Sequence, residues 1–249
     1  MSQRYFVETR ISGARATLVD AEAHHLAHVM RAKAGDQVIL FDGAGGEYAA
    51  VVERVARSTI ELAVLAHRAI ERELAAPVVV GASLPKGDRQ RWLIEKLVEL
   101  GVTDFVPLAT ARGVAQPVGN VVDRLRRAVV EASKQCGRNR LMQIQPPQEW
   151  RAFVCDAPAA AGRLIAHPGA DRTLADVVRG APSAAAAGVF LGVGPEGGFT
   201  DDEARLALSA GWTGVDLGAR ILRVETAAAT LAAAAAIMLG ESAPSSNDA

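Results

Sequence analysis

The residues of this sequence whose types and spacing could do chemistry lie in two glycine-bearing segments near the C-terminus. The first reads Gly-Val-Gly-Pro-Glu-Gly-Gly-Phe over residues 192–199 and follows an apolar run. Glycines there let a ligand approach the backbone and leave N–H groups near a helix start free to meet a carboxylate or phosphate. Pro195 and Glu196 interrupt the dinucleotide-binding GxGxxG spacing, and no GK[ST] follows as in a P-loop. An ordinary strand-to-helix turn is the alternative interpretation.

The second segment, residues 217–226, places Arg220 and Arg223 three positions apart, just before an alanine-rich stretch. A fixed cation can stabilise negative charge that develops during a reaction. Considered alone, the segment is equally well explained as a loop with solvated charges. If both segments follow neighbouring strands of one parallel sheet, they meet in the crevice at the carboxyl ends of the strands, where ligands bind in such sheets.

Hydrophobic periodicity predicts the elements that position these segments. From Pro77 onward, apolar strands alternate with helical patterns, which is typical of an α/β fold with a mostly parallel sheet. Thr200 and Glu203 form a capping box that opens one of the helices. The expected strands are 78–84, 102–108, 163–168, 188–194 and 214–218. The expected helices are 88–100, 120–136, 200–211 and 225–239.

The N-terminal part has a different character. Short β-like runs punctuated by glycine and aspartate predict a small β-barrel over residues 1–72, interrupted by one helix from Asp20 to Arg31. A charged, helical-looking piece at residues 68–77 links the two patterns. We therefore expect domains at 1–72 and 73–240, followed by a disordered tail at 241–249.

Composition narrows the function classes. The net charge is -1, so any nucleic-acid contact must come from local basic clusters. Cys136 and Cys155 are isolated, which indicates neither a disulfide framework nor a zinc site and suggests a reducing cytoplasm. His24 and His28 share a helix face, but no third ligand is apparent and we expect no metal. The N-terminus has no apolar run typical of a signal peptide, and the longest apolar run, 226–239, is too short to span a bilayer.

Several short motifs occur in a fixed order along nearly the whole chain, together with the two glycine-bearing segments. In this combination the sequence resembles the ribosomal RNA uracil-N3 methyltransferases of the SPOUT superfamily. One departure is Lys134, which stands where an acidic residue often precedes Gln135. The other motifs that carry the resemblance are Arg4-Tyr5-Phe6, His25-Leu26-x-x-Val29-Met30-Arg31, Gly35-Asp36, Phe41-Asp42-Gly43, Leu84-Pro85-Lys86-Gly87-Asp88-Arg89, Lys96-x-x-Glu99-Leu100-Gly101-Val102 and Gln135-Cys136-Gly137-Arg138.

The resemblance implies a C-terminal SPOUT α/β trefoil-knot methyltransferase domain and a small PUA-like N-terminal β-barrel for RNA. It implies a homodimer that uses S-adenosyl-L-methionine to methylate N3 of uracil(1498) in 16S ribosomal RNA, within the small ribosomal subunit. A SPOUT methyltransferase acting at another RNA position is one alternative. An RNA-binding ribosome-assembly protein that does not catalyse is another.

The same resemblance implies roles for single residues. Arg220 or Arg223 is expected to stabilise the uracil anion; alternatively, these arginines bind phosphate or pair with Glu196 or Glu225. Proton loss to water or to Glu196 stays open. The expected donor-binding residues are His167, Leu191, Gly192, Gly194, Pro195, Glu196, Gly197, Gly198, Leu217, Gly218, Ile221, Leu222, Arg223 and Thr226. The expected RNA-binding residues, with solvated faces as the alternative, are Arg4, His28, Arg31, Lys86, Arg89, Arg91, Arg138 and Arg140.

Overall fold

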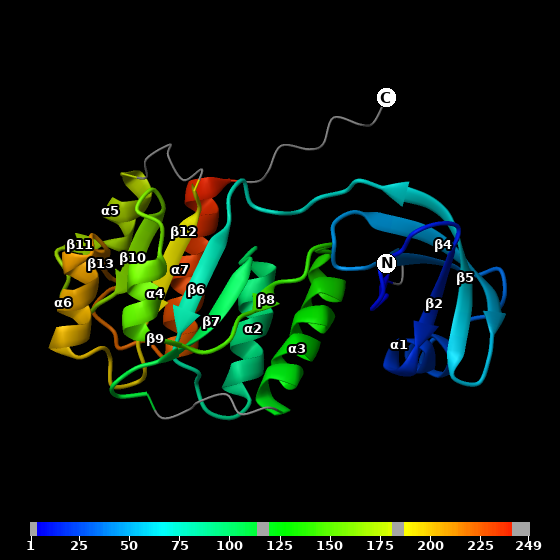
Figure 1. Ribbon diagram of the computed structural model, residues 1–249, viewed down its shortest axis with the longest axis horizontal. Coiled ribbons are helices and arrows are strands. Elements are labelled where there is room, and N and C mark those ends of the chain that lie inside the picture. Colours follow the sequence, from blue (N-terminus) through cyan, green and yellow to red (C-terminus); the bar gives the residue numbers. More distant parts are fainter. Residues whose placement is uncertain (1–3, 114–119, 181–186, 241–249) are drawn as a thin grey trace. The chain divides into compact units, whose positions relative to one another are not determined.

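Two separate sheets organise the chain (Figure 1). The computed structural model describes residues 4–113, 120–180 and 187–240, so the predicted disordered tail lies outside the described residues. The described residues form two units. The first contains residues 4–72 together with Ser133–Leu141, and the second contains most of the remaining chain.

The first unit is built on a five-stranded sheet in the order β1-β3-β4-β5-β2. Strand β1 runs parallel to β3, and the other neighbours are antiparallel. The alternation of buried and exposed residues along β2 places Ala16 and Leu18 in the core. The strands are β1 (Arg4–Phe6), β2 (Arg15–Val19), β3 (Gln37–Phe41), β4 (Glu47–Val55) and β5 (Thr59–Arg68).

The predicted helix from Asp20 to Arg31 forms as far as Val29 and changes from α-helix to π-helix along its length. It consists of α1 (Asp20–His24) and the π-helical segment η1 (His25–Val29). Arg31, with φ of 54°, ends the segment in the left-handed region, which a residue with a side chain rarely adopts. The π-helical turn leaves His28 exposed and directs Leu26 into the core of the first unit.

A buried polar cluster joins Ser133–Leu141 to the sheet of the first unit. Arg4 donates to the carboxylate of Glu47 at 2.6 Å and to Oδ1 of Asn139 at 2.5 Å. The Asn139 amide in turn donates to the carbonyl of Ile70 at 2.6 Å. Glu47, Asn139 and Arg138 are all buried, and so is most of the Arg4 side chain. Arg4 and Arg138, two of the residues expected to bind RNA, are therefore largely shielded from solvent in this structure.

The prediction of a helical linker at residues 68–77 is wrong. Strand β5 continues to Arg68, and no helix follows before Pro77. The charged side chains bond to distant residues instead of helical neighbours: Arg140 binds the Glu71 carboxylate with two nitrogens, at 2.8 and 3.0 Å. Pro77 also disfavours helical backbone at the preceding residue.

The second unit contains an eight-stranded sheet in the order β11-β13-β10-β12-β6-β7-β8, with β9 paired to β7. All its strand pairs are parallel, which confirms the α/β prediction. The strands are β6 (Val78–Ala82), β7 (Asp104–Ala109), β8 (Gln143–Ile144), β9 (Gln148–Glu149), β10 (Gly162–Ala166), β11 (Arg172–Thr173), β12 (Val189–Val193) and β13 (Thr213–Asp216).

Helices cover both faces of this sheet (Figure 1). Helices α2 and α5 each contact α7, and α7 packs on β6 and β12; α4 and α6 pack together on the other face. Among the described helices, none has the length and hydropathy needed to cross a membrane. The helices are α2 (Arg89–Glu99), α3 (Asn120–Cys136), α4 (Trp150–Asp156), α5 (Leu174–Arg179), α6 (Asp201–Ser209) and α7 (Val224–Leu239).

A pair of glycines on adjacent strands lets the aromatic rings of α4 approach the sheet. Gly81 of β6 and Gly192 of β12 are partners in the strand register. A Cβ added at Gly192 would lie 2.8 Å from Trp150, and one added at Gly81 would lie 2.6 Å from Phe153. Both distances are far below van der Waals contact, so any side chain at either position would displace a ring. Packing against Trp150 therefore requires a glycine at Gly192 independently of the ligand approach expected from the sequence.

We predict that Gly192→Ala and Gly81→Ala each destabilise the fold by about 1–3 kcal/mol, because the added methyl overpacks the interface with α4. Urea unfolding followed by circular dichroism measures the difference. Gly162→Ala on β10 is the matched control, since its added Cβ would meet Val189 at an ordinary 3.5 Å. Unchanged midpoints in both test variants would contradict the packing explanation.

Candidate functional site

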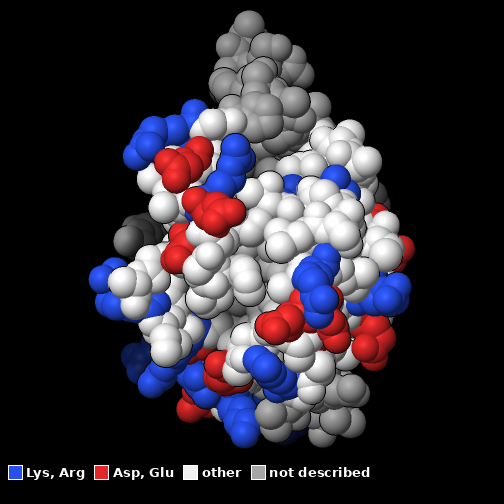
Figure 2. All heavy atoms as spheres, turned by 90° about the vertical axis from the view of Figure 1, so that its left-hand side faces the viewer, with Lys and Arg blue, Asp and Glu red and all other residues white. Residues whose placement is uncertain are grey.

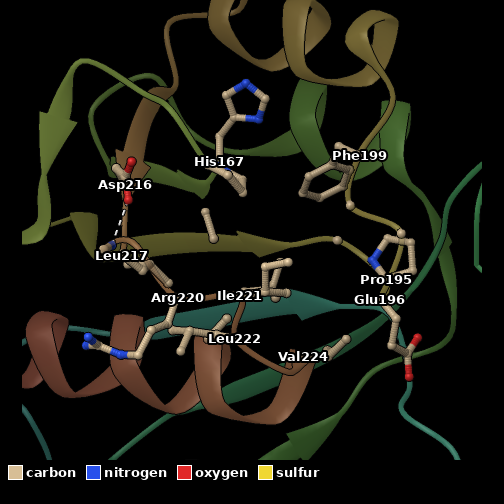
Figure 3. A pocket seen from close by; sticks show the side chains of 18 of the residues that line it. His167, Pro195, Glu196, Phe199, Asp216, Leu217, Arg220, Ile221, Leu222 and Val224 are labelled. Carbon is tan, nitrogen blue, oxygen red and sulfur yellow. Dashed lines mark hydrogen bonds between the residues drawn. The ribbon is translucent and has the colours of Figure 1, made fainter.

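A cavity of about 370 Å³ lies at the carboxyl ends of β10, β12 and β13 in the second unit (Figure 3). The loops that follow these three strands form its walls, and Val224 and Ala227 of helix α7 close it from below. Both glycine-bearing segments therefore line one cavity. The strands that they follow are not the neighbours that we expected, because β10 lies between β12 and β13.

Asp216, at the end of β13, fastens two of the three loops. One carboxylate oxygen accepts from the N–H of Gly218 at 2.6 Å, and the other accepts from the N–H of Gly169 at 3.0 Å. The backbone N–H of His167 donates to the carbonyl of Val215 at 3.0 Å. The loops after β10 and β13 are thus held together by one side chain, and the shape of this wall is fixed before any ligand arrives.

Two glycines of the cavity wall face open space. Gly198, with φ of +69°, and Gly218, with φ of +106°, have no atom within 4 Å of the position that a Cβ would take. Their backbone conformations are strained for residues with side chains, and both glycines line the cavity. A ligand can therefore lie directly against the backbone at both places.

The loop after β12 is anchored at its far end and on one side. The ring of Phe199 lies 4.3 Å from that of Trp150, measured between centroids. Next to it, Thr200 and Glu203 form the predicted capping box of α6, which confirms that helix start. On one side, a guanidinium nitrogen of Arg112 donates to the carbonyl of Gly197 at 2.7 Å. Arg112 follows strand β7, so its position could not be inferred from the motif itself.

Most of the predicted donor-binding residues come together in the cavity wall, but four do not. Leu191 is fully buried in the core, and Gly192 packs against Trp150. Arg223 is the exposed N-cap of α7, and Thr226 is exposed on the first turn of that helix. Those in the wall are His167, Gly194, Pro195, Glu196, Gly197, Gly198, Leu217, Gly218, Ile221 and Leu222, together with Arg220.

Other residues of the wall were not predicted. Asp216 carried a signal, because an aspartate two residues before a glycine commonly accepts that N–H in a turn. The remaining residues are small or apolar. They line the cavity because of the path of the backbone, so their residue types alone did not identify them as cavity residues. They are Ala166, Pro168, Val193, Phe199, Ala219, Val224 and Ala227.

The two arginines of the second segment do not pair with the nearby carboxylates in the part of the chain that the structure describes. Arg89 takes that place: its guanidinium lies 3.6 Å from Glu196 and 3.8 Å from Glu225. Figure 3 shows Arg220 and Glu196 at opposite sides of the cavity. The alternative in which Arg220 or Arg223 binds these glutamates is therefore wrong for this structure, and both guanidinium groups are exposed to solvent.

The predicted RNA-binding residues that remain are exposed to different degrees. His28, Arg31 and Lys86 are exposed, whereas Arg91 is paired with Glu95 at 2.6 Å and Arg140 with Glu71. Figure 2 shows one face of the molecule, where basic and acidic side chains alternate around a largely uncharged centre. On this face, contact with a polyanion would depend on a few local cations.

The cavity suits S-adenosyl-L-methionine in size and chemistry. Its volume falls within the range of small-molecule sites, and its walls are mainly apolar, with backbone groups exposed at the glycines. Leu217 and Leu222 offer a slot for a flat aromatic ring, and the open backbone at Gly198 and Gly218 offers hydrogen-bonding groups to its polar edges.

Comparison with known proteins agrees with this division of the chain. Residues 72–237 match the family described as RNA methyltransferase domain, and residues 18–65 match the RNA methyltransferase PUA domain. A solved structure of ribosomal RNA small subunit methyltransferase E from Neisseria gonorrhoeae, bound to S-adenosyl methionine, superimposes with a TM-score of 0.87. It is 29% identical in sequence, and the match covers 96% of this chain and 99% of that one.

Two curated relatives carry the same name. The protein from Synechocystis sp. is 35% identical over 226 residues, covering 88% of this chain and 71% of the relative. The protein from Mycobacterium tuberculosis is 32% identical over 243 residues, covering 94% of this chain and 91% of the relative. The chain therefore belongs to the RNA methyltransferase family whose curated members are named ribosomal RNA small subunit methyltransferase E.

Proposed function

We propose that this chain uses S-adenosyl-L-methionine to methylate N3 of a uridine in 16S ribosomal RNA, at the position of uracil(1498). The observation that carries the proposal is the single cavity formed by the two glycine-bearing loops, with open backbone at Gly198 and Gly218. The names of the relatives and the bound methyl donor in the structure from Neisseria gonorrhoeae support it.

In this proposal the loops after β10, β12 and β13 bind the methyl donor through apolar contacts and backbone hydrogen bonds. When bound, the donor supplies an electrophilic methyl group attached to a positively charged sulfur. Asp216 keeps two of the loops at a fixed separation, and Ile221, which is 99% exposed, can fold over a ligand in the cavity. The chain contributes shape and orientation here.

The uracil must lose the N3 proton before N3 can act as a nucleophile. This imide is about as acidic as tyrosine, so its deprotonation at neutral pH needs a cation near O2 or O4. Arg220 lines the cavity with an exposed guanidinium, and we assign it this role, with Arg223 beside it at the start of α7. N3 lies on the base-pairing edge, so the target base has to be unpaired or extruded.

RNA binding and assembly involve parts of the chain outside the cavity. The PUA-type unit and the exposed residues His28, Arg31 and Lys86 contact RNA within the small ribosomal subunit, in the cytoplasm. The chain forms a homodimer; exposed Ile221 and Ile237 on the methyltransferase unit leave apolar surface for it. We also expect the last part of the chain to be knotted, which is supported by the place of β13 outside β10 and the return of α7 to β12 and β6.

We predict that Gly218→Ala weakens donor binding about tenfold, because the added methyl occupies space at the cavity wall. Isothermal titration calorimetry with S-adenosyl-L-methionine measures the affinity. Gly13→Ala is the matched control: its φ of +112° gives similar backbone strain, and its added Cβ also meets nothing within 4 Å. Equal affinities in the two variants would show that the cavity is not the donor site.

We predict that Arg220→Ala and Arg223→Ala bind the donor within about twofold of the wild type but methylate RNA on the order of 100-fold more slowly. The loss falls on the chemical step because the positive charge acts on the uracil anion. Single-turnover rates on 16S RNA test this expectation, with Arg205→Ala on α6 as a control for loss of an exposed arginine. Full activity of both Arg220→Ala and Arg223→Ala would refute the assigned role.

The substrate itself is tested in cells that lack this gene and in the same cells after the gene is restored. Mass mapping of methylated nucleotides in 16S RNA should show one N3-methylated uridine that disappears and returns with the gene. A methyl group at a different position would point to another SPOUT specificity. Unchanged methylation, together with no donor binding, would favour a non-catalytic assembly protein.

A further inference from the structure

Arg89 connects the loop after β12, residues 194–199 (the glycine loop), to the buried start of helix α7. It is the first residue of α2 and is about one-third exposed. One terminal nitrogen lies 3.6 Å from Oε1 of Glu196 in the cavity wall, and the other lies 3.8 Å from Oε1 of Glu225. Because different nitrogens face the two carboxylates, one guanidinium can hold both glutamates at once.

Glu225 is unusual because its carboxylate is buried and incompletely bonded. Its side chain is only 8% exposed, and Oε2 has no hydrogen-bond partner among the described residues. Leaving a buried carboxylate oxygen unpaired is unfavourable. The N-terminal turn of α7 offsets part of this cost, because a helix start favours negative charge. An apolar side chain would serve packing better, so the carboxylate is explained by its contact with Arg89.

The two ion pairs of Arg89 are long, which leaves room for tighter contact. A guanidinium and a carboxylate that share two parallel hydrogen bonds approach to about 2.8 Å. A shift of about 1 Å would bring Arg89 into such a fork with Glu225, using the free Oε2. Glu225 is therefore prepared to hold Arg89 firmly, while the exposed Glu196 is the more easily released partner.

The glycine loop is gripped at two successive residues by arginines from neighbouring connections. Arg89 follows β6 and faces the Glu196 side chain, and Arg112 follows β7 and binds the Gly197 carbonyl at 2.7 Å. Inside the loop itself, the N–H of Gly198 donates to the Pro195 carbonyl at 2.8 Å. The middle of the loop is thus positioned largely from outside.

We propose that Glu225 and Arg89 are positioning residues for the cavity: buried Glu225 orients Arg89, and Arg89 orients Glu196 and the loop at 194–199. The role of this loop in holding the methyl donor rests on the proposed function. The chain of ionic contacts from Glu225 through Arg89 to Glu196, the ionic relay, does not rest on that function, because it is a property of the chain without ligand.

Hydrogen exchange without donor tests the relay. In Glu225→Gln and in Arg89→Met, the amides of Gly194 and of residues 196–199 should exchange at least about threefold faster than in the wild type; Pro195 has no amide hydrogen. The double variant should be no faster than Arg89→Met, because both changes break one chain of contacts. Arg89→Lys keeps the charge and should restore part of the protection, which also separates the relay from a general loss of fold.

Lys96→Met on the same helix is the matched control, since Lys96 pairs with Glu99 and has a similar exposure. It should leave exchange in the loop unchanged. Wild-type exchange at 194–199 in both single variants, or additive effects in the double variant, would overturn the relay.

Calorimetry with S-adenosyl-L-methionine then tests its consequence. The affinity of Glu225→Gln and of Arg89→Met should fall about tenfold, and that of Lys96→Met should not change. If the loop loosens while donor affinity stays at the wild-type value, the positioning role for donor binding is refuted. Absence of donor binding in the wild type would refute the proposed function instead, and the exchange result would still decide whether the relay exists.

Discussion

The close packing of helix α7 on strands β6 and β12 is the contact on which the rest of the methyltransferase unit depends. The helix buries a run of alanines and Leu231 against the sheet, and small side chains allow the helix to lie close to it. Its first turn thereby comes to lie beneath the glycine loop, where Val224 and Ala227 close the cavity and Glu225 meets Arg89. Without this contact the two glycine-bearing segments would have no common floor.

On the other face, the same sheet accepts the aromatic rings of α4 because Gly81 and Gly192 lie side by side. Trp150 contacts Gly192 and also packs, with its ring tilted, against Phe199, the last residue of the glycine loop. The two faces of the sheet therefore act on one loop: α4 fixes its end, while α2 and α7 hold its middle through Arg89 and Glu225.

Much of this arrangement follows from local sequence. Periodicity predicted the parallel sheet, and the Thr200 capping box identified the start of α6. Local sequence could not assign Gly192, because its role depends on Trp150, which belongs to a seven-residue helix too short to give a periodic signal. The prediction of a helix at residues 68–77 was wrong for a related reason. Its charges suit a helix, but their partners, such as Arg140, lie far along the chain.

Asp216 has a consequence for how a ligand enters. By accepting from Gly169 and Gly218 at once, it makes the ends of the loops after β10 and β13 move as one piece. This half of the cavity cannot act as a gate unless both hydrogen bonds break together. Access is therefore governed by the opposite half, where the loop at 194–199 is held by the long ion pair of Arg89. The cavity thus has one wall that Asp216 holds rigidly and a second wall, the loop at 194–199, that is held less tightly.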